Sequence, residues 1–158
     1  MDFYLVRHGE AASEAQERAR PLTQGGRETV EQVARSASAK QIQVAAVFHS
    51  GILRAKQTAD ILASHLCPTA GAHTMSGLLP DDDPMIARAE LEAAQQSIML
   101  VGHLPHMNRL AALLASGNAD RETVNFTPAT MVCFSYEKSQ WNIAWVLVPQ
   151  PELTGERR

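Results

Sequence analysis

The sequence predicts an α/β protein, a three-layer α/β/α sandwich with a mostly parallel central sheet. Two observations support this fold class. Strand-like and helix-like segments alternate along most of the chain, and the early strand-like segments are apolar without alternation, which is typical of parallel strands buried on both faces. The last two strand-like segments, 129–136 and 141–148, are joined by a polar turn, so we expect this hairpin to add at least one antiparallel strand.

The first strand is expected at 3–6, where aromatic and branched apolar residues follow one another without a polar break. Thr23 is a suitable N-cap for a helix at 24–40, in which valines and alanines fall on one stripe. The second strand, 44–48, is again apolar throughout. These three segments predict the start of a β-α-β arrangement.

The next helix is expected at 52–66, because its apolar residues recur at helical spacing and Pro68 stops it. Segment 71–75 is expected to be a short edge strand, followed by a loop at 77–84 that is rich in proline and aspartate. Helical spacing of apolar residues returns at 85–94.

A fully apolar strand is expected at 97–101. Pro105 suits the first turn of the helix that follows, and this helix ends near Gly117. The closing hairpin then completes the sheet.

The length and charge of the chain limit its organisation and its partners. At 158 residues it predicts one domain over 1–150 and a flexible tail at 151–158. A formal net charge of −3 gives no general attraction to nucleic acid or to an anionic membrane, so any anion site must be a local cluster of basic groups. No membrane span and no signal peptide are visible, which predicts a cytoplasmic protein, while the oligomeric state is left open.

The two cysteines, Cys67 and Cys133, do not make a disulfide framework or a zinc site. Both have apolar neighbours in the sequence. We therefore expect both to be buried thiols in a reducing compartment.

Basic or polar side chains follow three of the expected strands. Arg7 and His8 follow the first, Ser50 and Arg54 the second, and His103 the strand at 97–101. In open α/β sheets, ligands bind outside the carboxyl ends of the parallel strands. Two guanidiniums and two imidazoles gathered at that edge would form a site for a tetrahedral dianion.

Each of these residues also has a simpler interpretation, as a solvated charge or a structural histidine. Arg54 is the most informative, because the first turn of a helix disfavours a cation unless an anion lies nearby. His106 follows His103 at a spacing seen in metal sites, but no neighbouring cysteine or carboxylate completes a ligand set, so no metal is expected. The remaining histidines are interpreted as structural or exposed: His49, His65 and His73.

Three segments resemble the signature motifs of the histidine phosphatase superfamily, which has the phosphoglycerate-mutase-like fold. They are 5–10 (LVRHGE), 50–59 (SGILRAKQTA) and 101–103 (VGH), and they occur in the family's order and spacing. The resemblance covers nearly the whole chain. The short length and the segment 20–23 (RPLT) resemble the small bacterial phosphohistidine phosphatases of the SixA type.

The resemblance implies that His8 is a nucleophile that takes the phosphoryl group, and that Arg7, Arg54 and His103 bind the phosphoryl oxygens. It also places Gly9 and Ser50 among the substrate-binding residues, and it implies neither a metal nor a cofactor. A neutral imidazole is a good nucleophile, and a covalent phosphohistidine divides one displacement into two. We expect one tautomer of His8 to be held by a backbone carbonyl, that of Gly9.

The chain departs from the family pattern at two places. Gly51 stands where many relatives have proline, which we expect to alter the stiffness of the turn rather than the chemistry. Segment 77–80 (GLLP) lacks the glutamate that serves many relatives as a general acid. An aspartate of the following run could replace it, although such a run is more often a solvated loop: Asp81, Asp82 and Asp83.

The missing glutamate bears on the substrate. An alkoxide leaving group needs a proton donor, whereas imidazole has a conjugate acid of pKa about 6.5 and needs far less help. The sequence therefore predicts a phosphatase that acts on phosphohistidine of a protein, such as a phosphorelay domain. Two alternatives stay open: a phosphomonoesterase for small phosphate esters that uses a loop aspartate, and a phosphate-binding module without turnover.

Overall fold

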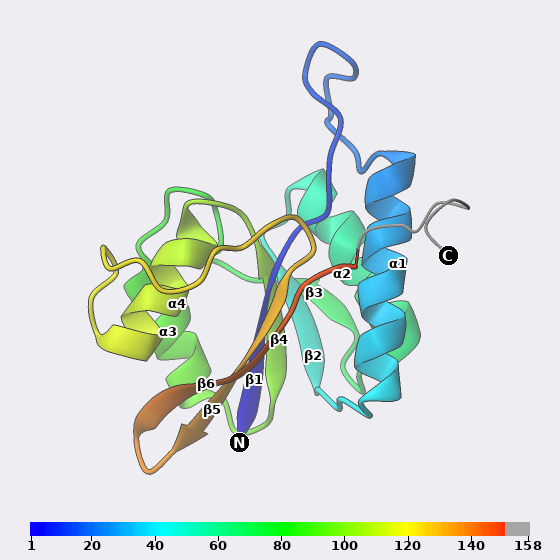
Figure 1. Cartoon of the computed structure of the whole chain (residues 1–158). Helices are drawn as coiled ribbons and strands as arrows, with labels where there is room; N and C mark the ends of the chain where they lie inside the picture. The colour runs from blue at the N-terminus through cyan, green and yellow to red at the C-terminus, as the bar shows by residue number, and fades with distance from the viewer. Residues whose placement is uncertain (151–158) are drawn as a thin grey trace.

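A computed structural model describes residues 1–150 and confirms the α/β sandwich (Figure 1). The tail expected at 151–158 lies outside the described residues. The elements follow one another as β1 Asp2–Arg7, α1 Gln24–Ala39, β2 Ala46–His49, α2 Leu53–Leu66, β3 Ala72–Thr74, α3 Pro84–Ala93, β4 Ile98–Gly102, α4 His106–Ser116, β5 Met131–Glu137 and β6 Gln140–Leu147.

The sheet has the strand order β3-β2-β4-β1-β5-β6. Its first four strands are parallel, and both strands of the closing hairpin are antiparallel to their neighbours. Strand β1 therefore lies inside the sheet, between β4 and β5. The carboxyl ends of the parallel strands share one edge, at the top of the view in Figure 1, where the segment after β1 rises above the sheet.

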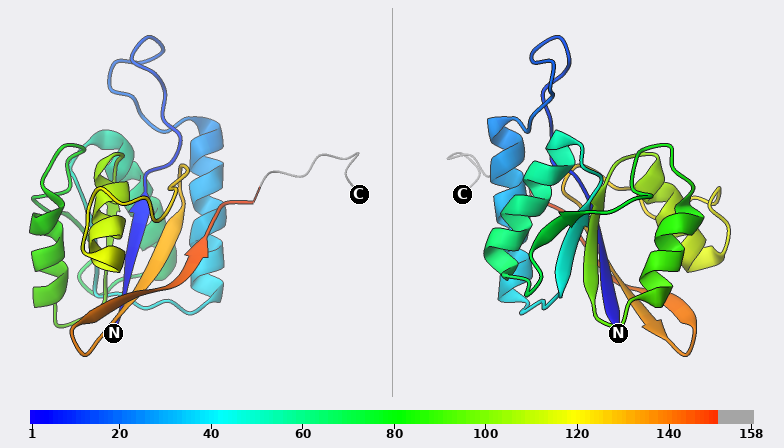
Figure 2. Two further views of the ribbon diagram at one scale, coloured as in Figure 1. Left: turned by 60° about the vertical axis from the view of Figure 1, so that its left-hand side comes forward. Right: turned by 180° about the vertical axis from the view of Figure 1, so that it is seen from behind.

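Helices α1 and α2 pack on one face of the sheet, and helices α3 and α4 pack on the other (Figure 2). Along β1, Tyr4 and Val6 pack into the core under α1 and α2, while Phe3 and Leu5 pack into the core under α3 and α4. Burial on both faces explains the unbroken apolar run in the sequence. None of the helices within residues 1–150 is long and apolar enough to cross a membrane.

Local signals set the helix ends. Thr23 caps α1, as the sequence predicts, because its side chain accepts a hydrogen bond from the Gly26 amide. Asp83 caps α3 in the same way through the Met85 amide, and Pro84 occupies the first turn. Helix α4 ends at Gly117, whose φ of 79° is left-handed.

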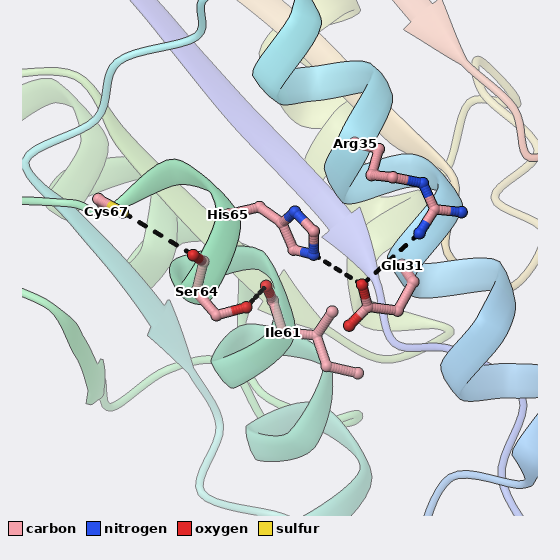
Figure 3. A network of polar contacts seen from close by, with 6 residues as sticks. All are labelled: Glu31, Arg35, Ile61, Ser64, His65 and Cys67. Atoms are coloured by element: carbon pink, nitrogen blue, oxygen red, sulfur yellow. Dashed lines mark hydrogen bonds and ion pairs between the residues drawn. The ribbon is translucent and has the colours of Figure 1, made fainter.

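Helices α1 and α2 are joined at the surface by a small polar network (Figure 3). The Glu31 carboxylate of α1 lies 2.6 Å from His65 Nε2 of α2 and 3.8 Å from Arg35. Cys67, at the end of this network, is exposed and caps α2 with a left-handed φ of 50°. The expectation of two buried thiols is therefore wrong for Cys67, because its place at a helix end outweighs its apolar neighbours. Cys133 is buried in β5.

Candidate active site

Strand register brings the candidate residues to one edge of the sheet. Arg7, the last residue of β1, pairs with Gly102 of β4, and His49 of β2 pairs with Val101. The residues that follow these strands are therefore neighbours: the rings of His8 and His103 lie 5.0 Å apart between centroids. We call the group formed by Arg7, His8, Arg54 and His103 the cup.

Backbone contacts hold His8 and define its tautomer. Its ring Nδ1 lies 2.7 Å from the Gly9 carbonyl oxygen, as expected from the sequence. A carbonyl only accepts, so Nδ1 carries the proton and Nε2 keeps a free lone pair. The His8 amide donates to the Gly102 carbonyl at 3.0 Å, which ties the residue to the end of β4. Nε2 is thus the atom of His8 that is able to attack an electrophile.

His103 is held by Ser50. The Ser50 hydroxyl oxygen lies 2.6 Å from His103 Nε2 and accepts a hydrogen bond from the Ile52 amide at 3.2 Å. The buried Nδ1 of His103 has no hydrogen-bond partner within residues 1–150. Ser50, expected to contact substrate, therefore contacts a ring of the cup in the unliganded protein.

The two guanidiniums of the cup lack acidic partners. Arg7 Nη1 donates to the Phe126 carbonyl oxygen at 2.8 Å, and Arg54 occupies the first turn of α2. Nε of each residue is buried without a hydrogen-bond partner. None of the ion pairs among the described residues includes either arginine. Burial lowers the pKa of both guanidiniums, which still keep their charge at neutral pH. The cup therefore holds positive charge that an anion would balance.

Burial and the neighbouring cations keep the imidazoles neutral. Burial, with smaller contributions from the charges of Arg54 and Arg7, lowers the pKa of His8 to about 4 against the opposing effect of the Gly9 carbonyl. Burial likewise lowers the pKa of His103 to about 3, together with the charges of His8 and Arg54. Both rings are therefore uncharged at neutral pH, and the charge of the cup comes from its arginines.

Thr58 is a residue of the site that the sequence analysis missed. Its hydroxyl accepts a hydrogen bond from the Gly9 amide at 3.0 Å and donates to the Arg54 carbonyl at 2.8 Å, while its side chain is fully buried. The spacing in the sequence could have indicated this role, because Thr58 lies four residues after Arg54 and therefore on the same face of the helix. The Gly9 amide, expected to face substrate, is taken by this bond.

The turn after β2 differs from a proline-containing one. Gly51 has a φ of 92°, whereas proline fixes φ near about −65°. The Gly51 amide also donates to His49 Nδ1 at 3.0 Å, a bond that proline is unable to make. His49 is thus a buried structural residue, as interpreted from the sequence.

Two of the three loop aspartates are engaged with backbone amides of their own loop. Asp82 accepts a hydrogen bond from the Leu79 amide at 2.9 Å, and Asp83 accepts one from the Met85 amide at 2.9 Å, while Asp81 is exposed. The charges of Asp82 and Asp83 act on buried His106 and raise its pKa against the larger, lowering effect of burial. No group of three metal-ligating side chains within residues 1–150 could hold a metal ion.

Comparison with known proteins places this geometry in context. A family model described as "Histidine phosphatase superfamily (branch 1)" matches residues 3–78. Phosphohistidine phosphatase SixA of Escherichia coli (strain K12) is 30% identical over 122 residues, covering 74% of this chain and 76% of that protein. An uncharacterized protein of Picosynechococcus sp. is 33% identical over 126 residues, covering 74% of each. The solved structure of the protein histidine phosphatase SixA complexed with tungstate matches with a TM-score of 0.83 at 26% identity, covering 94% of this chain and 97% of that one.

Proposed function

This chain belongs to the histidine phosphatase superfamily and is a phosphatase, and we propose that it removes the phosphoryl group from phosphohistidine of a protein, with His8 as the nucleophile. One observation carries the proposal. A neutral imidazole with an unprotonated Nε2 is acted on by the charges of two arginines that form no ion pair with a carboxylate within residues 1–150. This combination presents a nucleophile to phosphorus and positive charge to the oxygens around it.

The reaction takes two displacements. His8 Nε2 attacks phosphorus, a P–N bond to His8 forms, and the P–N bond to the substrate imidazole breaks. Water then attacks the same phosphorus, the bond to His8 breaks, and orthophosphate and neutral His8 are regenerated. Arg7, Arg54 and His103 bind the phosphoryl oxygens through both steps and offset the charge of each transition state.

The choice of phosphohistidine rests on the leaving group. A general acid of the kind that many relatives use would have to be a carboxyl group near the cup. Among residues 1–150, the charges that shift the pKa of His8 or His103 include no carboxylate. Asp82 and Asp83 of the loop before α3 accept hydrogen bonds from backbone amides instead. A phosphorylated imidazole takes a proton from solvent on its second nitrogen and leaves as neutral imidazole, so it needs no acid from the enzyme. An alkyl ester lacks this route.

The relatives support the same substrate class. The Escherichia coli protein is named a phosphohistidine phosphatase, and the matching solved structure binds tungstate, a tetrahedral oxyanion like phosphate. The partner that we propose is accordingly a histidine-phosphorylated protein, for example a phosphorelay domain.

A substrate panel tests the proposal. Purified protein is assayed on a histidine-phosphorylated protein, an alkyl phosphate and an aryl phosphate, with and without vanadate. We expect the highest kcat/KM on phosphohistidine, inhibition by vanadate, and alkyl ester turnover slower by ~10²-fold or more, because general acid catalysis typically contributes that much. Faster turnover of the alkyl ester, lost in Asp81→Asn, would identify a phosphomonoesterase instead.

Substitution of His8 tests the nucleophile. We expect His8→Asn to lose at least ~10³-fold in kcat, as removal of a nucleophile does in other enzymes, with an unchanged circular dichroism spectrum. His73→Asn, which changes an exposed histidine outside the cup, is the matched control and should retain full activity. Rapid quench followed by mass spectrometry should find the phosphoryl group on His8 in the parent protein. Retained activity in His8→Asn would mean that the nucleophile lies elsewhere.

A further inference from the structure

A third arginine stands near the cup on a different segment. The segment 10–23, which connects β1 to α1, rises above the carboxyl edge of the sheet (Figures 1 and 2). Its two arms are joined by a bridge between Ala11 and Leu22 and by a hydrogen bond from the Ala12 amide to the Pro21 carbonyl at 2.8 Å. Arg20 precedes this junction on the returning arm.

The backbone and the side chain of Arg20 are both constrained. Its φ of 51° is left-handed, a conformation that costs about 1 kcal/mol or more for a residue with a side chain. Its Nε donates to the Ala12 carbonyl at 3.0 Å. The Leu22 amide donates to Gln57 Oε1 of α2 at 2.8 Å, which ties the returning arm to the helix that carries Arg54. The guanidinium of Arg20 is thus held in place rather than free in solvent.

The charge of Arg20 is directed at the cup. The returning arm that carries Arg20 lies against the cup, because Leu22 Cδ2 would lie 3.3 Å from a Cβ on Gly9, the residue after His8, and the Leu22 amide is bonded to Gln57, three residues after Arg54. The charge of Arg20 also contributes, after burial, to the lowered pKa of His8, of His103 and of Arg54. Arg18, exposed two residues earlier on the same segment, acts on none of them. No carboxylate among residues 1–150 forms an ion pair with Arg20. Holding the Arg20 guanidinium near the positively charged arginines of the cup is electrostatically unfavourable in the unliganded protein. A bound anion would make the same arrangement favourable, because it attracts all of these cations.

We propose that Arg20 is a third phosphoryl-binding arginine, which reaches the cup from the segment 10–23 and binds the oxygens of the phosphoryl group. The inference rests on the proposed function, because it assigns the cup to a phosphoryl group. The bond from Nε to Ala12 fixes the side chain and leaves both terminal nitrogens of the guanidinium for the substrate.

Binding of inorganic phosphate to the whole protein tests this role without depending on turnover. Dissociation constants are measured by calorimetry at constant ionic strength for the parent protein and for Arg20→Gln, Arg20→Lys and Arg18→Gln. We expect Arg20→Gln to weaken binding by about 10- to 100-fold, the effect of losing hydrogen bonds to a charged group. Arg18→Gln removes the same charge from the same segment and should bind phosphate as the parent does.

The lysine variant distinguishes the effect of the positive charge of Arg20 from the effect of its hydrogen bond to Ala12. Arg20→Lys keeps the charge but loses the bond from Nε to Ala12, so phosphate affinity between those of the parent and of Arg20→Gln supports the proposal. Affinity equal to that of Arg20→Gln would assign the effect to the shape of the segment and overturn it. Parent-like affinity in Arg20→Gln, or an equal loss in Arg18→Gln, would also overturn it. Failure of the parent to hydrolyse phosphohistidine would overturn the proposed function alone, because phosphate binding is measured separately.

Discussion

His8 owes its chemical character to its surroundings more than to its residue type. An exposed imidazole with a pKa of about 6.5 is partly protonated at neutral pH. Here burial and the nearby arginines move the pKa to about 4, while the Gly9 carbonyl selects the tautomer with a free Nε2. The ring is therefore neutral, with Nε2 unprotonated, in the unliganded protein, which is the state that the proposed nucleophile requires.

The protonation state of His8 is directly measurable. At pH 5.5 an exposed histidine is about 90% protonated, whereas we expect the His8 ring of the unliganded protein to be almost entirely neutral. Nuclear magnetic resonance titration of the imidazole protons follows this state, and His8→Gln identifies the signal by removing it. A midpoint near 6.5 would contradict the electrostatic description of the cup.

Thr58 provides a second prediction at the scale of single residues. Thr58→Val keeps the shape of the side chain but leaves the buried Gly9 amide without an acceptor, which should lower the free energy of unfolding by about 1–3 kcal/mol. Displacement of Gly9 should also reduce kcat. Urea unfolding measures the first effect, with Thr58→Ser, which keeps the hydroxyl, as the control. Stability of Thr58→Val equal to that of Thr58→Ser would show that the bond contributes nothing.

The residues of the cup could be proposed from sequence because each lies at the end of a buried strand or in the first turn of the helix that follows one. The bond from the Gly9 amide to Thr58 and the bond between Ser50 and His103 could not, since each joins segments that are distant along the chain. The Gly9 amide and the Thr58 hydroxyl are 49 residues apart, and the bond between Ser50 and His103 spans 53. Neighbouring residues in the sequence do not reveal such pairings.

At the scale of elements, the position of His8 depends on how closely α1 approaches the end of β1. A Cβ on Gly9 would lie 2.6 Å from Val30 Cγ2, and a Cβ on Gly26 would lie 2.1 Å from the Glu10 carbonyl oxygen. The glycine after His8 is thus required by its packing against a helix rather than by an unusual backbone angle.

The adjacent glycines of α1 make a matched pair for testing this approach. Gly26→Ala forces the helix away from Glu10, so we expect a loss of stability above about 1–3 kcal/mol, as for overpacked cores, and reduced kcat. Gly25→Ala has open space, with its nearest atoms 3.9 Å away, and should stabilise the helix by about 0.5–1 kcal/mol. Thermal and urea unfolding give both values. Equal effects of the two substitutions would contradict this packing.

The bounds of the elements follow from local signals, whereas the order of the strands does not. Helix α1 begins at the residue after Thr23, as its capping side chain predicts, and α4 ends one residue before Gly117. The sequence could not specify that β4 lies between β2 and β1, because pairing depends on long-range contacts through helices on both faces. The exposure of Cys67 was also not predicted, because it depends on where the end of α2 lies relative to the core, and long-range contacts determine that position.

At the scale of the whole molecule, several buried histidines make stability depend on pH. Burial lowers the pKa values of His8, His49, His103 and His106 in the folded protein. Below pH 6.5 the unfolded chain takes up more protons at these rings than the folded protein does. Acidification therefore favours unfolding in this range, down to about pH 4 for His8.

We expect the free energy of unfolding to fall as the pH drops from 6.5 to 4.5, by up to about 1.4 kcal/mol per pH unit for each such histidine. Urea unfolding at intervals of half a pH unit measures the slope. His8→Gln removes one of these groups and should give a shallower slope. A stability that is constant over this range would contradict the assignment.

The unpaired arginines have a consequence for the end of the catalytic cycle. Hydrolysis finishes with orthophosphate, the same tetrahedral anion that the surplus positive charge attracts, still seated among those side chains. Escape of the product is then opposed by the electrostatics that speed the chemistry, and free inorganic phosphate competes with every new substrate. We therefore expect inorganic phosphate to inhibit turnover in competition with substrate, as steady-state kinetics at increasing phosphate concentration would measure.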